Sequence, residues 1–214
     1  MAKIPFGILG PVIGSIGPVT GKTWKNKATL SSHRRPAKTD KKPTPAQLNQ
    51  RGKFGFVSQF MNGLGPLAKK SFHELADGKT EFHCAVSYNV CNAVSGAYPD
   101  YTLHYDRVSL GRGTLPNAVL PEAKAGDGPG DIRFIWADNT GMGTAAARDK
   151  AIAVIYLPAE KYWLYLKQPD ALRSDCSLVR NLGGYKGTVH TWLLFVSDSG
   201  KASDSVYTGE LVLG

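Results

Sequence analysis

The chain has 214 residues, of which 42% are hydrophobic and 20% are charged, and its formal net charge is +9. This composition is normal for a folded globular protein, and no run reaches the roughly 18–20 apolar residues that a membrane-spanning helix needs. The charge is unevenly placed, since residues 1–53 hold 11 of the 26 Lys and Arg but a single acid, Asp40. A segment so basic buries too little apolar surface to fold alone, so the sequence predicts a basic, Gly- and Pro-rich N-terminal arm over residues 1–44 on a nearly neutral body.

The N-terminus begins as a signal peptide does, with one lysine followed by apolar residues. Glycine and proline at Gly7, Gly10, Pro11 and Gly14 then interrupt the apolar run, and no small-residue cleavage site follows. We therefore expect a protein that is cytoplasmic when made. If it assembles, a virion or an extracellular filament would be its final location.

Glycine is spaced regularly in the arm, at residues 7, 10, 14, 17 and 21, and Gly-Pro-Val occurs at 10–12 and again at 17–19. So much glycine and proline excludes a helix here. Residues 19–24 and 27–32 are predicted strands of a hairpin, because Asn26 tolerates the left-handed backbone of a tight turn. An isolated hairpin is only marginally stable in water, so this one has to pack on the body or on a neighbouring subunit. A basic, proline-rich linker follows over residues 33–45.

A helical segment is predicted over residues 45–101. Thr44 can cap the first helix, Pro45 fits its first position and Gln47 completes a capping box. A second helix is expected over 67–75, and a third begins after Thr80 and ends at a Gly96 cap.

From residue 102 the apolar residues no longer recur with the helical period and instead recur at every second position, which is typical of strands. The predicted strands are residues 103–110, 131–137, 151–157, 162–167, 177–181, 189–197 and 205–213, with mobile loops at 122–130 and 139–148. The strand that starts at Val189 is apolar on both faces, which favours a central position. Short strands separated by turn signals predict a β-sandwich of immunoglobulin or fibronectin type III character over residues 102–214. The predicted fold class is therefore α+β, with the helical layer covering one sheet.

Signals for catalysis are absent from the sequence. It contains no Gly-x-Gly-x-x-Gly, P-loop, His-Glu-x-x-His or Gly-x-Ser-x-Gly motif, and its five histidines are scattered. The three cysteines are an odd number without Cys-x-x-Cys spacing, which predicts buried free thiols. We therefore expect a protein that is not an enzyme and that needs no cofactor and no metal.

The arm admits three interpretations. It is a solvated tail, a nucleic-acid-binding segment, or an assembly arm that adds to the sheet of another copy. Assembly is favoured because the arm carries a periodic apolar pattern that neither a solvated tail nor a phosphate-binding arm needs. The residues predicted to mediate assembly are Ile8, Val12, Ile13, Ile16, Val19, Trp24 and Leu30. The residues predicted to contact nucleic acid, in the alternative, are Lys22, Lys25, Lys27, Arg34, Arg35, Lys41 and Lys42.

Four stretches of the chain also resemble a family of short, uncharacterised proteins, mostly from Bacteroidota, that is described as a domain of unknown function. They are Gly14-Ser-Ile-Gly-Pro-Val-Thr-Gly-Lys-Thr-Trp24, Lys42-Pro-Thr-Pro-Ala-Gln-Leu-Asn-Gln-Arg-Gly-Lys-Phe54, Ala85-Val-Ser-Tyr-Asn89 with Gly96-Ala-Tyr-Pro-Asp-Tyr101, and Ser203-Asp-Ser-Val-Tyr-Thr-Gly209. The resemblance implies one compact unit with an attached arm and brings no activity, cofactor or catalytic residue. A filament or virion subunit is our hypothesis from the arm itself.

Overall fold

The computed structural model describes residues 10–24, 27–32, 42–167, 169 and 171–214. The chain divides into two compact units, Met1–Thr44 and Pro45–Gly214. No helix within the described residues has the length and apolar character that crossing a membrane requires.

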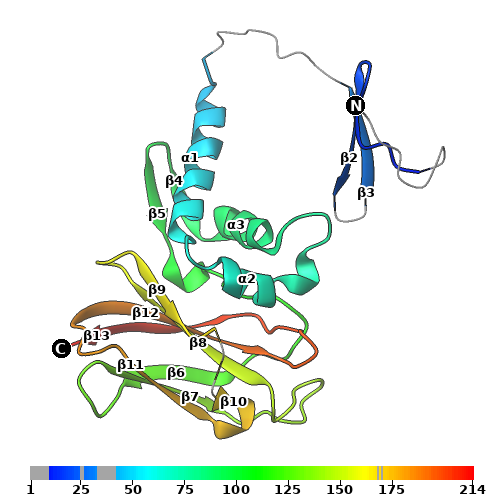
Figure 1. Ribbon diagram of the computed structural model, residues 1–214. Coiled ribbons are helices and arrows are strands. Elements are labelled where there is room, and N and C mark those ends of the chain that lie inside the picture. Colours follow the sequence, from blue (N-terminus) through cyan, green and yellow to red (C-terminus); the bar gives the residue numbers. More distant parts are fainter. Residues whose placement is uncertain (1–9, 25–26, 33–41, 168, 170) are drawn as a thin grey trace. The chain divides into compact units, whose positions relative to one another are not determined.

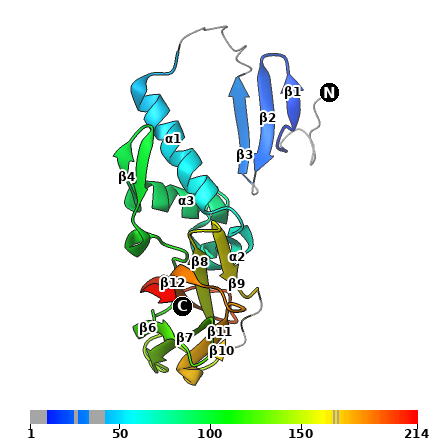
Figure 2. The same ribbon diagram turned by 90° about the vertical axis from the view of Figure 1, so that its left-hand side faces the viewer.

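The first unit contains a three-stranded antiparallel sheet, drawn in blue in Figure 2, in the order β1 (Gly14–Ile16), β2 (Val19–Trp24) and β3 (Lys27–Ser32). β2 and β3 occupy the two strands of the predicted hairpin, whereas β1 was not predicted. A Cβ atom at Gly21 would collide with the Val12 carbonyl, so only glycine lets the segment before β1 lie so close to β2.

The second unit begins with the helices α1 (Pro45–Phe60), α2 (Gly65–Ser71) and α3 (Glu81–Asn92), with the 3₁₀ turn η1 (His73–Leu75) before α3. The Thr80 hydroxyl caps α3 by accepting a hydrogen bond from the His83 backbone N–H at 3.2 Å. The predicted cap at Gly96 is wrong. That residue has a φ of 91° within the hairpin of β4 (Val94–Ala97) and β5 (Asp100–Leu103), a backbone that glycine adopts without strain.

Two antiparallel sheets complete this unit. The three-stranded sheet has the order β11-β7-β6, formed by Ser177–Asn181, Asp131–Ala137 and Val119–Ala125. The five-stranded sheet has the order β10-β8-β12-β13, formed by Ala171–Leu172, Lys150–Leu157, Gly187–Val196 and Val206–Leu213. Its fifth strand, β9 (Tyr162–Tyr165), also pairs with β8.

The five-stranded sheet lies between the helices and the three-stranded sheet, as both ribbon views show (Figures 1 and 2). Alternate residues of its central strands enter different cores. Val154 of β8 and Trp192 of β12 pack beneath the helices, while Ile155 and Leu193 face Phe134 of the second sheet. The strand starting near Val189 is therefore central, as its two apolar faces predicted, and mixed α+β architecture is confirmed.

The strand predicted at 103–110 is wrong beyond its first residue, because the chain forms the 3₁₀ turn η2 (Tyr105–Arg107) and then irregular backbone. The alternating pattern arose because Val108 and Leu110 are both buried under the helices. The backbone of Ser109 bonds to the Asn89 side chain, which donates to its carbonyl and accepts from its N–H, both at 2.8 Å. A side chain of α3 thus takes the place of a neighbouring strand.

The loop predicted at 122–130 is also wrong in part, because its first four residues belong to β6. β6 lies at the edge of its sheet and buries only Ala123 among its seven side chains, so it lacks the apolar pattern that marks a strand. The remaining residues form a tight turn, in which the Gly126 N–H donates to the Asp131 carbonyl at 2.7 Å.

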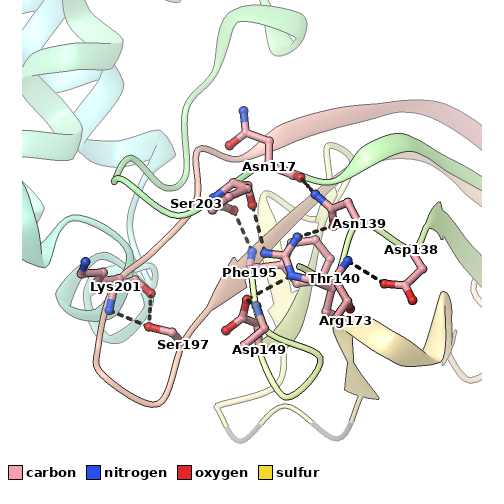
Figure 3. Close-up of polar contacts among 12 residues, drawn as sticks. Asn117, Asp138, Asn139, Thr140, Asp149, Arg173, Phe195, Ser197, Lys201 and Ser203 are labelled. Atoms are coloured by element: carbon pink, nitrogen blue, oxygen red, sulfur yellow. Dashed lines mark hydrogen bonds and ion pairs between the residues drawn. The ribbon is translucent and has the colours of Figure 1, made fainter. Parts of the chain in front are cut away.

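A buried arginine joins the loops at one end of the two sheets (Figure 3). Arg173, in the 3₁₀ turn η3 (Arg173–Asp175), donates from Nε to Asp149 at 3.0 Å and from Nη1 to Asn139 at 2.6 Å. Its Nη2 donates to the Pro116 carbonyl at 3.0 Å, and the guanidinium lies 3.9 Å from the centre of the Phe195 ring. Arg173 and Asp149 are both buried, so a substrate has no access to this cluster. We therefore assign it a structural role, in which it holds the loops together.

Candidate functional site

The sheet of the first unit has two chemically different faces, which follow from its register. Residues directly opposite each other on antiparallel strands point to the same side. Ile16 pairs with Val19, and Leu30 pairs with Gly21, so these side chains share one face with Ala28. Thr23 and Ser32 also lie on this side, opposite Ala28 and Val19. We call Ile16, Val19, Ala28 and Leu30 the apolar face. Val12 lies over Gly21 on the same side.

The other side is the basic face. It consists of Ser15, Thr20, Lys22, Trp24, Lys27, Thr29 and Ser31. The Ser15 and Thr20 hydroxyls are 3.2 Å apart, which agrees with this assignment. Trp24 is 58% exposed and sits directly across from Lys27.

The predicted site residues thus separate into two groups. Ile16, Val19 and Leu30 come together on the apolar face, with Val12 packed beside them, whereas Trp24 joins Lys22 and Lys27 on the opposite face. Ile13 is exposed just before β1, and Lys42 is exposed just before α1, so neither belongs to a face defined by the strand register. Ile8, Lys25, Arg34, Arg35 and Lys41 lie outside the described residues.

This small sheet has almost no core of its own. Within residues 10–24 and 27–32, Gly21 alone is buried, while Ile16 is 52% and Leu30 is 68% exposed. A sheet of this size needs a packed apolar face for stability in water. The apolar face therefore requires a cover.

The second unit carries an aromatic groove of about 720 Å³ at the end of α1. Its apolar surface comes from segments far apart in the sequence. The aromatic residues that line it include Phe56, Phe60, Tyr105, Tyr156, Tyr162 and Trp163. The rings of Phe60, Tyr156 and Trp163 lie with their centres 4.6–5.0 Å apart and form its buried side. Gln59, Asn62, Lys161 and Lys167 supply the polar groups of its rim.

Hydrogen bonds from β9 fix one wall of this groove to the helix. The Trp163 indole N–H donates to the Phe60 carbonyl at 2.7 Å, and the Tyr165 hydroxyl donates to the Gly63 carbonyl at 3.3 Å. The first bond satisfies a carbonyl at the C-terminal end of α1, and the second satisfies one in the turn that follows the helix. Burial also raises the pKa of Tyr105, Tyr156 and Tyr165 above the ordinary tyrosine value, so all three stay neutral at physiological pH. The groove is thus a rigid, uncharged aromatic surface with a cationic rim.

Behind the groove, Tyr105 stacks on His190 with ring centres 3.7 Å apart, and His190 Nδ1 lies 2.8 Å from the Tyr207 hydroxyl. Burial lowers the pKa of His190. Glu210, which pairs with His190 from the neighbouring strand β13, acts on this pKa in the opposite direction. Burial, with a contribution from Glu210, raises the pKa of Tyr207 to about 12.

We expect His190 to weaken the fold in acid. An unfolded histidine titrates near ~6.5, so below that pH the unfolded chain binds a proton that the folded chain resists. The free energy of unfolding should therefore fall as the pH drops from about 6.5 toward the lower folded pKa of His190. Urea unfolding at pH 7.5 and 5.5 measures this loss, which should be smaller in His190→Gln than in the wild type. An equal loss in the two proteins would show that His190 is not buried in its neutral form.

The described residues offer little else for catalysis. Among them, no group of three or more His, Cys, Asp or Glu is placed to hold a metal ion. The cysteines are free, as predicted, but the prediction that they are buried is wrong, since Cys91 is exposed and Cys84 and Cys176 are only half-buried. Cys91 lies in the last turn of α3, on the side turned away from the core.

Sequence reasoning missed the aromatic groove and the separation of the two faces. The groove has one local signal, the run Tyr162-Trp163-Leu164-Tyr165, but its other residues meet only in the folded chain. The two faces had a clear signal, because Val19 and Trp24 are an odd number of residues apart within one strand and so point to opposite sides.

One family, described as a family of unknown function (DUF6266), matches residues 11–209, a range that includes the N-terminal sheet and nearly all of the second unit. None of the curated proteins matches the chain.

Proposed function

Because the chain belongs to this family of unknown function, we propose its role from geometry alone, as a non-enzymatic structural subunit that assembles with copies of itself. In this proposal the N-terminal sheet of one copy adds to a neighbouring copy, as a donor strand does, in a filament or a virion. The observation that carries it is the apolar face, which has no core beneath it within the described residues of its own unit.

The free energy of apolar burial favours contact with protein over a solvated tail. Fully burying one Ile, Leu or Val side chain stabilises a contact by about 1.5–3 kcal/mol, and the apolar face presents three such side chains on adjacent strands. Large exposed apolar patches on a rim of polar residues are typical of interaction surfaces. A freely solvated tail would leave this surface in water.

We also propose that the two sheets of the second unit form a sandwich of the immunoglobulin or fibronectin type III kind. Its support is the strand order. If β6, β7, β8, β9, β11, β12 and β13 are named A, B, C, C′, E, F and G, one sheet reads A-B-E and the other C′-C-F-G. Trp136 lies between the sheets, edge-on to Phe195 with ring centres 5.7 Å apart. Such a body is a rigid module on which assembly contacts can be built.

Nucleic-acid binding is the second candidate, and the basic face is the observation that favours it. There Trp24 stands beside Lys22 and Lys27 on one side of the sheet. An exposed aromatic ring next to cations suits base stacking together with phosphate contacts. This face and the apolar face point in opposite directions, so the two candidates depend on different residues.

Deleting residues 1–35 should separate assembly from folding. The core of the second unit lies entirely within residues 45–214, so the shortened chain should remain folded and monomeric while the full chain forms larger species in light scattering. The larger species should persist in about 0.5 M NaCl, because apolar burial is not weakened by salt, whereas phosphate contacts weaken steeply. A full-length chain that is monomeric at tens of micromolar would contradict the proposal, and species lost with salt or nuclease would favour the second candidate.

A further inference from the structure

The apolar face ends in a tight turn formed by residues 16–19. Ile16 and Val19 are paired directly across the turn Gly17-Pro18, and all four residues are exposed. Gly17 has a φ of 52°, which glycine adopts without strain, and so the chain reverses within two residues. This turn, residues 16–19, carries no charge and presents a proline ring between two aliphatic side chains.

We propose that the aromatic groove of one copy is the acceptor for the 16–19 turn of a second copy. The inference rests on the proposed self-assembly and names the surface that receives the N-terminal sheet. Proline-containing segments dock in grooves lined by aromatic rings, which offer flat apolar faces to the proline ring. The groove of about 720 Å³ lies within the range of volumes that bind compact ligands, and Phe56, Phe60 and Tyr162 line it with rings that are at least partly exposed.

The edge of β9 supports the same occupant. Among the described residues, β9 pairs with β8 alone, so its outer edge offers backbone groups without a strand partner beside the groove. β1, the extended edge strand that leads into the turn, can add there through main-chain hydrogen bonds, while the turn itself enters the adjacent groove. The amides of Gln59 and Asn62 on the rim can bond further backbone groups of the incoming chain.

The charges near the groove select the uncharged turn over the basic face. Lys161 and Lys167 stand on the rim and would repel Lys22 and Lys27, but the 16–19 turn carries no charge and points its aliphatic side chains away from the basic face. The contact would therefore bring no like charges together at its centre. Burial of apolar surface is its driving force, in keeping with the salt resistance expected above.

A contact between a turn and a groove joins two different surfaces, so each copy has one donor and one acceptor. Such head-to-tail contacts propagate into an open filament or close into a ring. They also allow a complementation test, because a copy without its donor and a copy without its acceptor can still form one contact between them.

The test uses full-length chains in sedimentation velocity. The donor variant is Ile16→Ser with Val19→Ser, and the acceptor variants are Tyr162→Ala, which removes an exposed wall, and Gln59→Trp, which fills the groove from an exposed helical position. Each variant alone should sediment as a monomer, and an equimolar mixture of donor and acceptor variants should give a one-to-one complex and nothing larger. Val212→Ser, an exposed change on β13, is the control and should assemble as the wild type does.

The outcomes distinguish a failure of the groove as acceptor from a failure of the proposed self-assembly. Normal assembly of the acceptor variants, with assembly lost in the donor variant, would overturn the groove as acceptor and leave the proposed function intact. Two monomeric variants that form no complex when mixed would also overturn the groove. If both donor and acceptor variants assemble normally, or if the wild type stays monomeric, the proposed function falls together with this inference.

Discussion

Replacing Arg173 with methionine should lower the free energy of unfolding by about 3–5 kcal/mol, the cost of leaving a buried charge without its partner. The Asp149 carboxylate would keep only the hydrogen bond from the Ala146 N–H, at 2.9 Å, in a site closed to water. The Asn139 side chain and the Pro116 carbonyl would also lose their donors. Three segments far apart in the chain would then be joined less firmly at this end of the sheets (Figure 3).

Arg133 provides a matched control for this substitution. It also pairs with an aspartate, Asp127, at 2.7 Å, but the two side chains are 48% and 89% exposed. Exposed pairs contribute about 0–1 kcal/mol, so Arg133→Met should leave the denaturation midpoint nearly unchanged. Changing Asp149 to Asn in the Arg173→Met background should restore part of the lost stability, because it removes the uncompensated charge. Equal midpoints for Arg173→Met and Arg133→Met would contradict the structural role of the cluster.

The sequence was most informative where one physical cause dominates the pattern. Strands β7 and β11 occupy their predicted residues because alternate side chains enter a core that covers one face of a sheet. The hairpin of β2 and β3 was predicted from a short turn between two runs of strand-forming residues. β8 and β12 were recognisable because strands buried on both faces are apolar throughout.

Prediction was wrong where neighbours from elsewhere in the chain decide the structure. Val108 and Leu110 alternate like strand residues, yet the backbone between them bonds to the side chain of Asn89 on a distant helix. β6 has a single buried side chain, so its partner β7 and not its own pattern makes it a strand. The aromatic groove is lined by residues from α1, η2, β8 and β9, and no local sequence pattern indicates that these residues come together in the fold.

The candidate interaction surface was predicted in part. The apolar residues of the arm could be identified from their spacing, but Trp24 was grouped with them although the strand register places it with Lys22 and Lys27. The register is also what makes the two hypotheses separable. Assembly depends on one side of the sheet and nucleic-acid binding on the other.

Removing the apolar face should therefore abolish assembly, while removing charge from the basic face should not. In Ile16→Ser with Leu30→Ser, each substitution removes about 1.5–3 kcal/mol of apolar burial from every contact between copies. In Lys22→Gln with Lys27→Gln, exposed charges worth about 0–1 kcal/mol each are lost and the apolar face is intact. The two double variants change the same number of residues in the same small sheet, on opposite faces, so each is the control for the other.

Sedimentation velocity of these two double variants beside the wild type, in low salt and in about 0.5 M NaCl, shows which face of the sheet mediates assembly. The wild type and the lysine variant should form the same large species at both salt concentrations. The isoleucine and leucine variant should sediment as a monomer. Loss of the large species in the lysine variant, with the apolar variant unaffected, would contradict assembly through the apolar face and favour nucleic-acid binding by the basic one.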